Sequence, residues 1–264
     1  MTDPLFSLIT ISYNDLAGLR RVVESVDAQD ERDLEHVVVD GGSTDGTVDY
    51  LRSLPETPWR HWRSEPDGGI YDAMNRGIER STGRLVMMLN AGDSLAGPSS
   101  LAQVAASFHE HQWQWSYGAV RFVRPDGSHA GSYTFDPFHR IRFVMGFLWI
   151  PHAAVTMRRE LLDRIGGYRT DLGSSADQEL LMRALRVSEP TVIPEFLCHF
   201  ERGGVSQQGS ARGRELAWHR MRRENELTVG PAWTDRLVSE ALAVRSPARR
   251  LARRLTGSSG MYTE

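Results

Sequence analysis

Continuous hydrophobic runs in the first part of the chain stop abruptly at glycine and acidic residues. The run LVMMLNAGDSL ends its apolar stretch at Asn90, and HVVVDGGSTDG makes the same change at Asp40. Runs that are apolar at every position are typical of central strands in a parallel sheet covered on both faces. Ligands of open α/β sheets bind beyond the carboxyl ends of the strands. The pattern therefore predicts a site at that edge, where Asp40 and Asp93 would suit a divalent cation that carries phosphates.

Strand and helix patterns alternate up to about residue 97. Apolar residues at helical spacing over 16–28 predict a helix, and Ser43 or Thr44 is expected to cap a second helix around residues 48–51. Such alternation is typical of βαβ units with a parallel sheet. The other expected elements here are strands at 6–12, 34–39, 59–62 and 84–89, and a helix at 70–80.

The pattern changes after Pro98. A helix that reaches about His111 is followed by a hairpin around the turn sequence Pro125-Asp126-Gly127. Near Gln207 the aliphatic strands give way to an arginine-rich helical pattern. The other expected elements are hairpin strands at 115–123 and 128–135, a strand at 153–157, and helices at 159–165 and 176–187, the last opened by Ser174 or Ser175.

Composition permits a large α/β domain and excludes other classes of protein. The 264 residues are 40% hydrophobic, enough for a sizeable core, and a net charge of −3 gives no electrostatic footprint for nucleic acid. A single cysteine, Cys198, excludes an intramolecular disulfide and fits a reducing compartment. No basic region precedes the first apolar stretch, and the apolar segment FVMGFLWI is far shorter than the about 20 residues that span a bilayer. We therefore expect a cytoplasmic protein.

Six segments in order carry a family resemblance: ITISYN, VVVDGGSTDGT, EPDGGIYDAMNRGI, STGRLVMMLNAGDSL, PHAAVTMRRELLDRIGGY and SSADQELLMRAL. They resemble bacterial family 2 glycosyltransferases with the GT-A fold, especially those of exopolysaccharide (colanic-acid type) and mycobacterial phenolic-glycolipid synthesis. The resemblance, from Leu5 to Ser206, implies an α/β fold with a mixed, mostly parallel sheet flanked by helices and a helical C-terminal tail. The implied domains are a GT-A domain at 1–206, with a donor half at about 1–97 and an acceptor half at about 98–206, and an arginine-rich extension at 207–264.

The activity that the resemblance implies is inverting transfer of a sugar from a nucleoside-diphosphate sugar to a hydroxyl of a glycan, glycolipid or natural product. Two alternatives stay open. One is a nucleotide-sugar-binding protein that has lost catalysis. The other is a nucleotidyltransferase, although the exit of the first strand, Ser12-Tyr13-Asn14-Asp15, lacks a glycine-rich phosphate loop. The same turn lacks G-x-G-x-x-G, which disfavours a dinucleotide-dependent oxidoreductase.

The exit of the first strand is the first part of the expected nucleotide site. Tyr13 offers a ring that can stack on a nucleobase, and backbone groups from Thr10 to Asn14, including Ser12, can hydrogen-bond the base edge. A tyrosine that merely packs in the core near a strand end is the structural alternative.

The loop after the second strand departs from the family pattern. By resemblance, Asp40 binds the base or the ribose, and Gly41 lets the backbone approach the ligand closely. Gly41 stands where many relatives carry a base-reading aspartate. This departure leaves the base of the donor open: UDP is favoured by the resemblance, and GDP and dTDP are the alternatives.

Asp93 is the expected metal ligand. It aligns with the last carboxylate of the family's Asp-x-Asp motif, while Asn90 takes the first acidic position and Ala91 and Gly92 lie between them. One carboxylate together with substrate phosphates and water can hold Mn²⁺ or Mg²⁺, which neutralises charge on the leaving diphosphate. His199 is a second candidate ligand, and an aspartate that only ends a strand in a turn is the structural alternative.

Two expected helices contribute side chains to the pocket. Asp72, Asn75 and Arg76 open the first and, by resemblance, face the donor. Asp177 opens the second and is the expected catalytic base that takes the proton of the acceptor hydroxyl, with Glu179 as the runner-up. Asp177 could instead only stabilise the positive end of its helix.

The remaining candidates lie toward the acceptor and the C-terminus. His152 matches a family histidine beside the acceptor and phosphates, and Arg202 and Ser206 belong to a segment that resembles the loop closing over the diphosphate. The basic amphipathic pattern at 246–255 fits peripheral contact with an anionic membrane, and it also fits a solvated helix or a homodimer contact.

Overall fold

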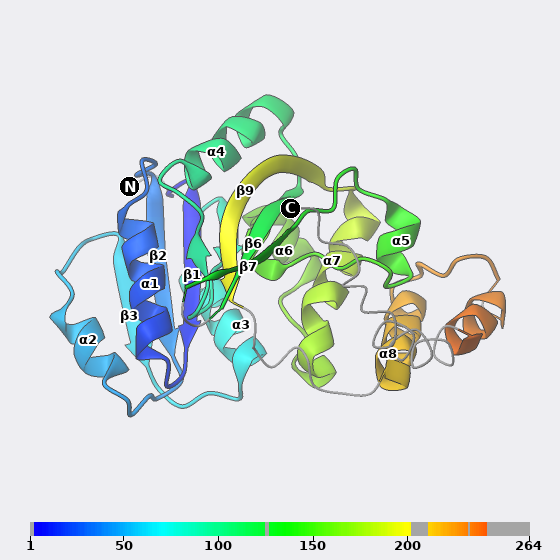
Figure 1. Ribbon diagram of the computed structural model, residues 1–264, viewed down its shortest axis with the longest axis horizontal. Coiled ribbons are helices and arrows are strands. Elements are labelled where there is room, and N and C mark those ends of the chain that lie inside the picture. The colour runs from blue at the N-terminus through cyan, green and yellow to red at the C-terminus, as the bar shows by residue number, and fades with distance from the viewer. Residues whose placement is uncertain (1–2, 125–126, 202–210, 232, 242–264) are drawn as a thin grey trace.

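A nine-stranded sheet runs through the computed structural model, which describes residues 3–124, 127–201, 211–231 and 233–241 (Figure 1). The strand order is β3-β2-β1-β4-β8-β6-β9-β5, and β7 pairs with β6 outside this path. The strands are β1 (Phe6–Ser12), β2 (Leu34–Asp40), β3 (Arg60–Ser64), β4 (Leu85–Met88), β5 (Ser94–Leu95), β6 (Trp115–Val123), β7 (His129–Tyr133), β8 (Val155–Arg158) and β9 (Thr191–Glu201).

The sheet is mixed and mostly parallel, which confirms the predicted fold class. β1 is parallel to β2 and β4, and β2 is parallel to β3. β8 lies antiparallel between β4 and β6, and β9 is parallel to β6. β6 and β9 therefore run in the same direction as β4. β5, β7 and β8 run in the opposite direction.

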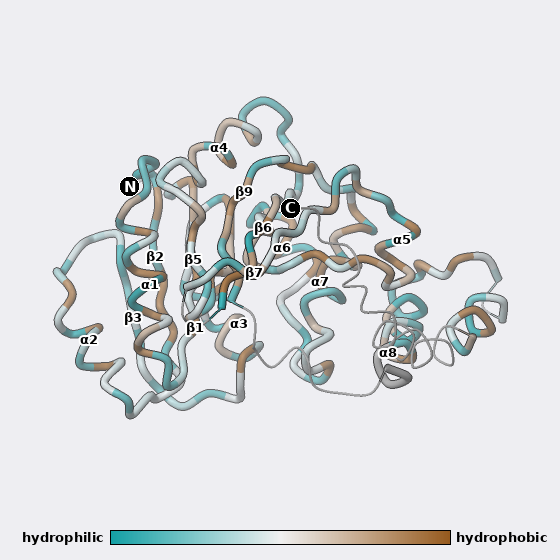
Figure 2. Tube along the Cα trace, viewed as in Figure 1, coloured by the Kyte–Doolittle hydropathy of each residue, from teal (hydrophilic) through white to brown (hydrophobic). Residues whose placement is uncertain are grey.

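Helices cover the sheet, and α5, α7 and α8 gather at the end of the molecule farthest from β3 and α2 (Figure 1). The colouring in Figure 2 alternates along α1, as expected of a helix with one buried face. The helices are α1 (Leu16–Asp27), α2 (Thr47–Ser53), α3 (Ile70–Arg80), α4 (Ser100–His111), α5 (Arg140–Val144), α6 (Arg159–Ile165), α7 (Ala176–Val187) and α8 (Ala211–Glu224), with 3₁₀ turns η1 (His152–Ala154) and η2 (Thr170–Ser175).

The predicted cap of α2 is wrong. The helix begins after Gly46, which has φ of 96° and makes no side-chain cap, and Asp45 Oδ1 accepts a hydrogen bond from Thr47 N at 3.1 Å instead. Ser43 is engaged elsewhere, because its hydroxyl donates to Asp40 Oδ1 at 2.5 Å. For α7, Ser175 is the residue before the helix, but it too makes no side-chain cap.

Three elements were not anticipated, namely β5, β9 and α5. β9 forms the longest pairing of the acceptor half, parallel to β6 with register shifts, although its sequence interrupts the apolar positions with Pro194 and Glu195. The expected hairpin is present as β6 and β7, and the expected strand at 153–157 begins two residues later as β8, after η1.

Both faces of the sheet are buried. Ile9 and Ile11 of β1 belong to one hydrophobic cluster, while Phe6 and Leu8 belong to another. Successive side chains of a strand point to opposite faces, so this division shows that β1 is covered on both sides. Because β1 is covered on both faces, all of its positions are buried, and this explains the hydrophobic run in its sequence.

A histidine is buried within this sheet. His36 Nε2 lies 2.9 Å from Thr10 Oγ1, and Arg60 Nε donates to His36 Nδ1 at 3.2 Å. Burial and the Arg60 charge lower the pKa of His36 to about 3. Since Nδ1 accepts a hydrogen bond, the proton of the neutral ring is on Nε2 and is donated to Thr10.

The described part of the C-terminal region packs on the acceptor half. Met221 of α8 is buried in the same hydrophobic cluster as Leu181 of α7. Arg222 is also buried, and its guanidinium donates to Asp235 Oδ1 at 3.0 Å and to Val144 O at 3.2 Å. No helix in the described ranges combines the length and hydrophobicity needed to cross a membrane. The basic pattern at 246–255 lies outside these ranges, and the division at residues 206 and 207 stays a prediction.

Candidate active site

The ends of β1, β2 and β4 meet at one edge of the sheet. Ser12 is in register with Asp40, and Ala91 N donates to Ile11 O at 2.9 Å just beyond β4. The turn that follows contains Gly92 at φ of 98° and is closed by a bond from Asp93 N to Asn90 O at 3.0 Å. The structure thus brings both predicted groups of rim residues to the same edge.

Asn14 fixes the exit of β1 against the loop after β2. Its backbone N donates to Ser43 Oγ at 2.7 Å, and its Oδ1 accepts from Thr44 N at 2.9 Å, with Asn14 at φ of 50°. Tyr13 projects from this fixed turn with 68% of its surface exposed. It is therefore not a core tyrosine, and its ring is open to a ligand. The Thr10 side chain, in contrast, faces His36 in the core.

The carboxylate of Asp40 is buried and fully occupied. Oδ2 accepts from Gly42 N at 3.2 Å, Ser43 N at 2.9 Å and Ser64 Oγ at 2.6 Å, while Oδ1 accepts from Ser43 Oγ. This pattern holds the loop after β2 and ties it to β3. Contact of Asp40 with a nucleotide stays a prediction.

His152 lies between two carboxylates at the centre of the rim. Its Nδ1 is 3.5 Å from Asp177 Oδ2, and its Nε2 is 3.6 Å from Asp93 Oδ2. Burial alone would lower the pKa of His152, but the Asp177 and Asp93 carboxylates outweigh burial and raise it to about 10. The imidazole is therefore protonated at neutral pH, and its positive charge links the predicted base to the predicted metal ligand.

Asn90 completes the contacts of this histidine. Its Nδ2 is 2.9 Å from His152 Nε2, and its Oδ1 is buried without a hydrogen-bond partner among the described residues. A protonated Nε2 donates rather than accepts, so the amide is better satisfied when turned to place Oδ1 at Nε2. In that orientation Asn90 Oδ1 accepts from His152 Nε2, beside the Asp93 carboxylate.

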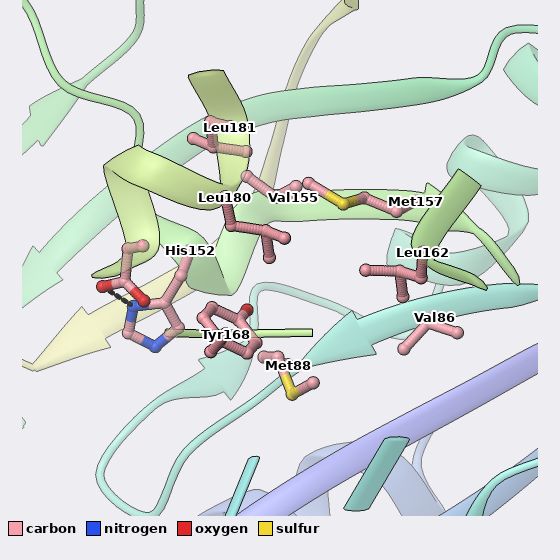
Figure 3. Close-up of a pocket in the computed structure, with 10 residues that line it drawn as sticks. Val86, Met88, His152, Val155, Met157, Leu162, Tyr168, Leu180 and Leu181 are labelled. Atoms are coloured by element: carbon pink, nitrogen blue, oxygen red, sulfur yellow. Dashed lines mark ion pairs between the residues drawn. The ribbon is translucent and has the colours of Figure 1, made fainter. Parts of the chain in front are cut away.

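Aromatic and aliphatic side chains surround the ion pair. His152 and Asp177 line a cavity of about 20 Å³ whose other walls are largely apolar. Figure 3 shows the Tyr168 ring next to the imidazole, Met88 and Leu180 close to that ring, and Leu162 on the far side. Burial and the charge of Asp177 raise the pKa of Tyr71 and of Tyr168, whose rings lie 5.6 Å apart. Low local polarity strengthens the pairing of His152 with Asp177.

Asp93 has a second carboxylate nearby. Its Oδ1 accepts from Glu201 N at 3.1 Å at the end of β9, and Glu201 forms an ion pair with Arg21 of α1. Burial raises the pKa of Glu201, with Arg21 acting in the opposite direction. The described residues contain no group of three or more His, Cys, Asp or Glu side chains placed to hold a metal. The donor set fits an Mg²⁺ or Mn²⁺ ion that takes one protein carboxylate and is otherwise held by phosphates and water.

The remaining candidates on α3 have partners within the protein. Asn75 Nδ2 donates to Tyr168 O at 2.9 Å and its Oδ1 accepts from Tyr168 N at 2.7 Å, so it clamps the loop after α6. Asp72 pairs with Arg76 at 2.9 Å, and Arg76 also donates to Pro66 O at 3.0 Å. These contacts organise the start of α3, and direct contact with a donor stays a prediction.

The runner-up base points elsewhere. Glu179 is buried and held by Arg183, whose Nε lies 3.0 Å from both carboxylate oxygens. His199 lies opposite Ser94 in the β5–β9 pairing, with its Nδ1 3.5 Å from Ser94 Oγ. Arg202 and Ser206 lie outside the described residues.

Sequence reasoning missed Tyr71, Tyr168, Glu201 and Asp67 as rim residues. Each reaches the site through tertiary packing, and none has a local pattern of its own. All four lay in segments already singled out, Tyr71 and Asp67 in EPDGGIYDAMNRGI, Tyr168 at the end of PHAAVTMRRELLDRIGGY and Glu201 at the start of the predicted closing loop, but none was given a role of its own.

Comparison with known proteins assigns the family. The family model described as glycosyl transferase family 2 matches residues 7–166. The chain is 39% identical over 242 residues to an uncharacterized glycosyltransferase of Mycobacterium tuberculosis, covering 90% of this chain and 89% of the relative. It is 34% identical over 216 residues to a PGL/p-HBAD biosynthesis glycosyltransferase of Mycobacterium bovis, covering 78% and 80%. The chain belongs to glycosyl transferase family 2, as the resemblance predicted.

Solved structures share the fold at low identity. S. aureus TarS 1-349 in complex with UDP-GlcNAc aligns with a TM-score of 0.70 at 18% identity, over 96% of this chain and 76% of that one. The mannosyltransferase PcManGT from Pyrobaculum calidifontis, in complex with GDP-Man and Mn²⁺, aligns with a TM-score of 0.63 at 21% identity, over 98% and 77%. These likenesses confirm the predicted GT-A fold.

Proposed function

We propose that this glycosyltransferase moves a sugar from a nucleoside-diphosphate sugar to a hydroxyl of a glycan, glycolipid or natural product, with inversion at the anomeric carbon and assistance from a divalent metal. The observation that carries the proposal is the row Asp93, His152, Asp177, which joins a phosphate-side carboxylate to a second carboxylate across one imidazolium. Among the solved structures that share the fold, TarS 1-349 is in complex with UDP-GlcNAc, and PcManGT is in complex with GDP-Man and Mn²⁺. Both complexes support a nucleotide-sugar donor.

Asp177 is the proposed general base. The Asp177 carboxylate faces His152 through Oδ2 and also interacts with the Tyr71 hydroxyl, while its Oδ1 is buried with no hydrogen-bond partner in the described part of the chain. We assign Oδ1 as the oxygen that accepts the hydroxyl proton. The acceptor oxygen forms its bond to the anomeric carbon while the bond from that carbon to the diphosphate oxygen breaks, and the electron pair leaves with the diphosphate. The hydroxyl proton passes to Asp177.

The positive charge of His152, beside Asp177, positions the groups that take part in the same reaction. It holds Asp177 in place through Nδ1 and faces Asp93 through Nε2. Asp93 would hold a bound Mg²⁺ or Mn²⁺, which supplies neutralisation of the charge on the leaving diphosphate. Tyr13, with its exposed ring, stacks on the base at the other end of the donor.

The substitution Asp177→Asn tests the assignment of the base. It keeps the shape of the side chain and removes its basicity, so transfer should fall by at least about a hundredfold while donor affinity stays within about twofold. Asp163→Asn, on the exposed side of α6, is the matched control and should retain wild-type activity. Loss of donor affinity in Asp177→Asn would show that the residue binds the donor instead.

A thermal-shift series with UDP, GDP, dTDP and CDP, each with and without Mn²⁺, tests the donor site. A ligand that binds only the folded state raises its stability by mass action. We expect a metal-dependent shift with at least one diphosphate and loss of the metal effect in Asp93→Ala. Absence of any shift would refute the nucleotide site, and binding without turnover of any sugar donor would favour a binding protein that has lost catalysis.

A further inference from the structure

A carboxylate lies directly over Gly41 at the nucleotide edge of the sheet. A Cβ atom on Gly41 would lie 2.8 Å from Asp67 Oδ2 and 3.2 Å from Tyr13 Cδ2. The exposed ring of Tyr13, the bare Cα of Gly41 and the carboxylate of Asp67 therefore form one small recess. Asp67 comes from the loop between β3 and α3, so this group is assembled from three separate segments.

Space, and not backbone conformation, favours glycine at position 41. The neighbouring Gly42 has φ of 84°, in the left-handed region that disfavours side chains, whereas Gly41 is not among the residues with positive φ. Position 41 could carry a side chain on backbone grounds. A side chain there would displace the Asp67 carboxylate from its present place.

The Asp67 carboxylate is held in a fixed orientation and keeps one oxygen unused. Its Oδ1 accepts from Gly69 N at 2.8 Å, and the next turn is closed by Asp72 Oδ2, which accepts from Gly68 N at 2.8 Å. Within the described ranges, Oδ2 of Asp67 makes no hydrogen bond. Asp40, the other carboxylate at this corner, has both oxygens occupied by its own loop and by Ser64.

We propose that Asp67 reads the base of the donor nucleotide, with the base stacked on Tyr13 and its edge turned toward Asp67 Oδ2 over Gly41. This assignment rests on the proposed function of the site. An ionised carboxylate only accepts hydrogen bonds, so it can accept from the amino groups of cytosine and adenine, but the lone pair on the neighbouring ring nitrogen of those two bases repels it. It therefore favours bases whose ring nitrogen at that position carries a hydrogen. Uracil and thymine offer N3–H, and guanine offers N1–H with its amino group, whereas cytosine and adenine have no ring N–H on that edge. The chemical class selected is a uridine, thymidine or guanosine diphosphate sugar.

Calorimetric titration of Asp67→Ala with two ligands tests the proposal. The first ligand is whichever of UDP, dTDP and GDP binds the wild type most tightly in the presence of Mn²⁺, and the second is inorganic pyrophosphate with Mn²⁺. We expect the nucleotide affinity to fall about tenfold to a hundredfold, as for loss of a hydrogen bond to a charged group, with pyrophosphate affinity unchanged. Glu79→Ala, at an exposed position of α3, removes a carboxylate from the helix that follows the Asp67 loop and should change neither affinity.

Moving the carboxylate gives a second, independent test. Gly41→Asp alone places two carboxylates in one recess and should weaken nucleotide binding, whereas Gly41→Asp combined with Asp67→Gly should restore at least half of the lost binding free energy. Recovery in the double variant also shows that the double variant is folded, and far-UV circular dichroism checks the folding of each single variant. Non-additivity of this kind marks two positions that serve one contact.

The outcomes separate this proposal from the proposed function. If the wild type binds a nucleoside diphosphate and Asp67→Ala binds it equally well, base reading by Asp67 is wrong and the transferase assignment stands. If Asp67→Ala loses nucleotide and pyrophosphate affinity together, the residue shapes the loop and does not read the base. If the wild type prefers CDP or ADP, the selection argued here is wrong, and if it binds no nucleotide the proposed function fails as well.

Discussion

Lowering the pH should reduce the free energy of unfolding of this protein, because one buried histidine, His36, is held in its neutral form. His36 is neutral in the folded state because its Nδ1 accepts from Arg60 and its surroundings are apolar, and its pKa is lowered to about 3. In the unfolded chain the same imidazole takes up a proton near pH 6.5. Stability from this group is therefore fully present above pH 6.5 and is lost as the pH falls toward 3.

The size of the effect follows from these two values. Lowering the pH from 7 to 5 should reduce the free energy of unfolding by about 2 kcal/mol through His36 alone, given a pKa of about 3 in the folded state. His152 acts in the opposite direction, because its pKa is raised to about 10 and its contribution is largest below pH 6.5. A comparison of variants that differ only at His36 cancels this second contribution.

Urea unfolding of the wild type and His36→Gln, followed by tryptophan fluorescence at pH 7, 6 and 5, measures the difference. A glutamine side chain can bond to both Thr10 and Arg60 and does not titrate, so the wild type should lose about 2 kcal/mol more than the variant between pH 7 and 5. His61→Gln, an exposed position on β3, is the matched control. Parallel pH profiles for wild type and His36→Gln would show that the imidazole is not held neutral, and the argument from Arg60 would be refuted.

Three other substitutions test the packing around the site. Gly77→Ala would place its Cβ 2.2 Å from Ile9 Cγ2 and should cost about 1–3 kcal/mol, so an unchanged urea midpoint would show that α3 can move off the sheet. Asp235→Ala leaves the buried Arg222 without its carboxylate and should cost about 3–5 kcal/mol, with faster amide exchange in α8 as the readout and unaltered exchange as the contrary result. Asn75→Ala removes two hydrogen bonds to the loop after α6 and should lower stability by about 1–3 kcal/mol, and a neutral effect would mean that water replaces the clamp.

The strands of the donor half were predictable because each is buried on both faces. Phe6–Ser12 and Leu34–Asp40 are buried at every position, and continuous burial leaves a continuous apolar run in the sequence. β9 gives no such signal, because exposed residues in its middle coincide with the register shifts against β6. A strand that is exposed in the middle and pairs across a bulge is recognisable only once its partner is placed.

The site was predictable only where a residue ends a strand or opens a helix. Asp93 and Asp177 lie at such positions and were given their roles by the family resemblance, as was His152, and the structure brings the two aspartates to opposite sides of His152. The protonation state of His152 depends on how close each aspartate lies to its ring. Local sequence does not encode these distances. Asp67 was overlooked for the same reason, because its relation to Gly41 exists only after β2 and α3 have packed together.

The antiparallel strand β8 allows the two halves of the chain to supply the same edge from opposite directions. β1, β2 and β4 deliver their residues as they end, whereas His152 arrives just before β8 begins, at the same edge because β8 runs the other way. The histidine is therefore positioned by the strand downstream of it. Insertions or deletions in the chain upstream of Pro151 would remodel the surface on that side, while the imidazole would keep its place between the two aspartates.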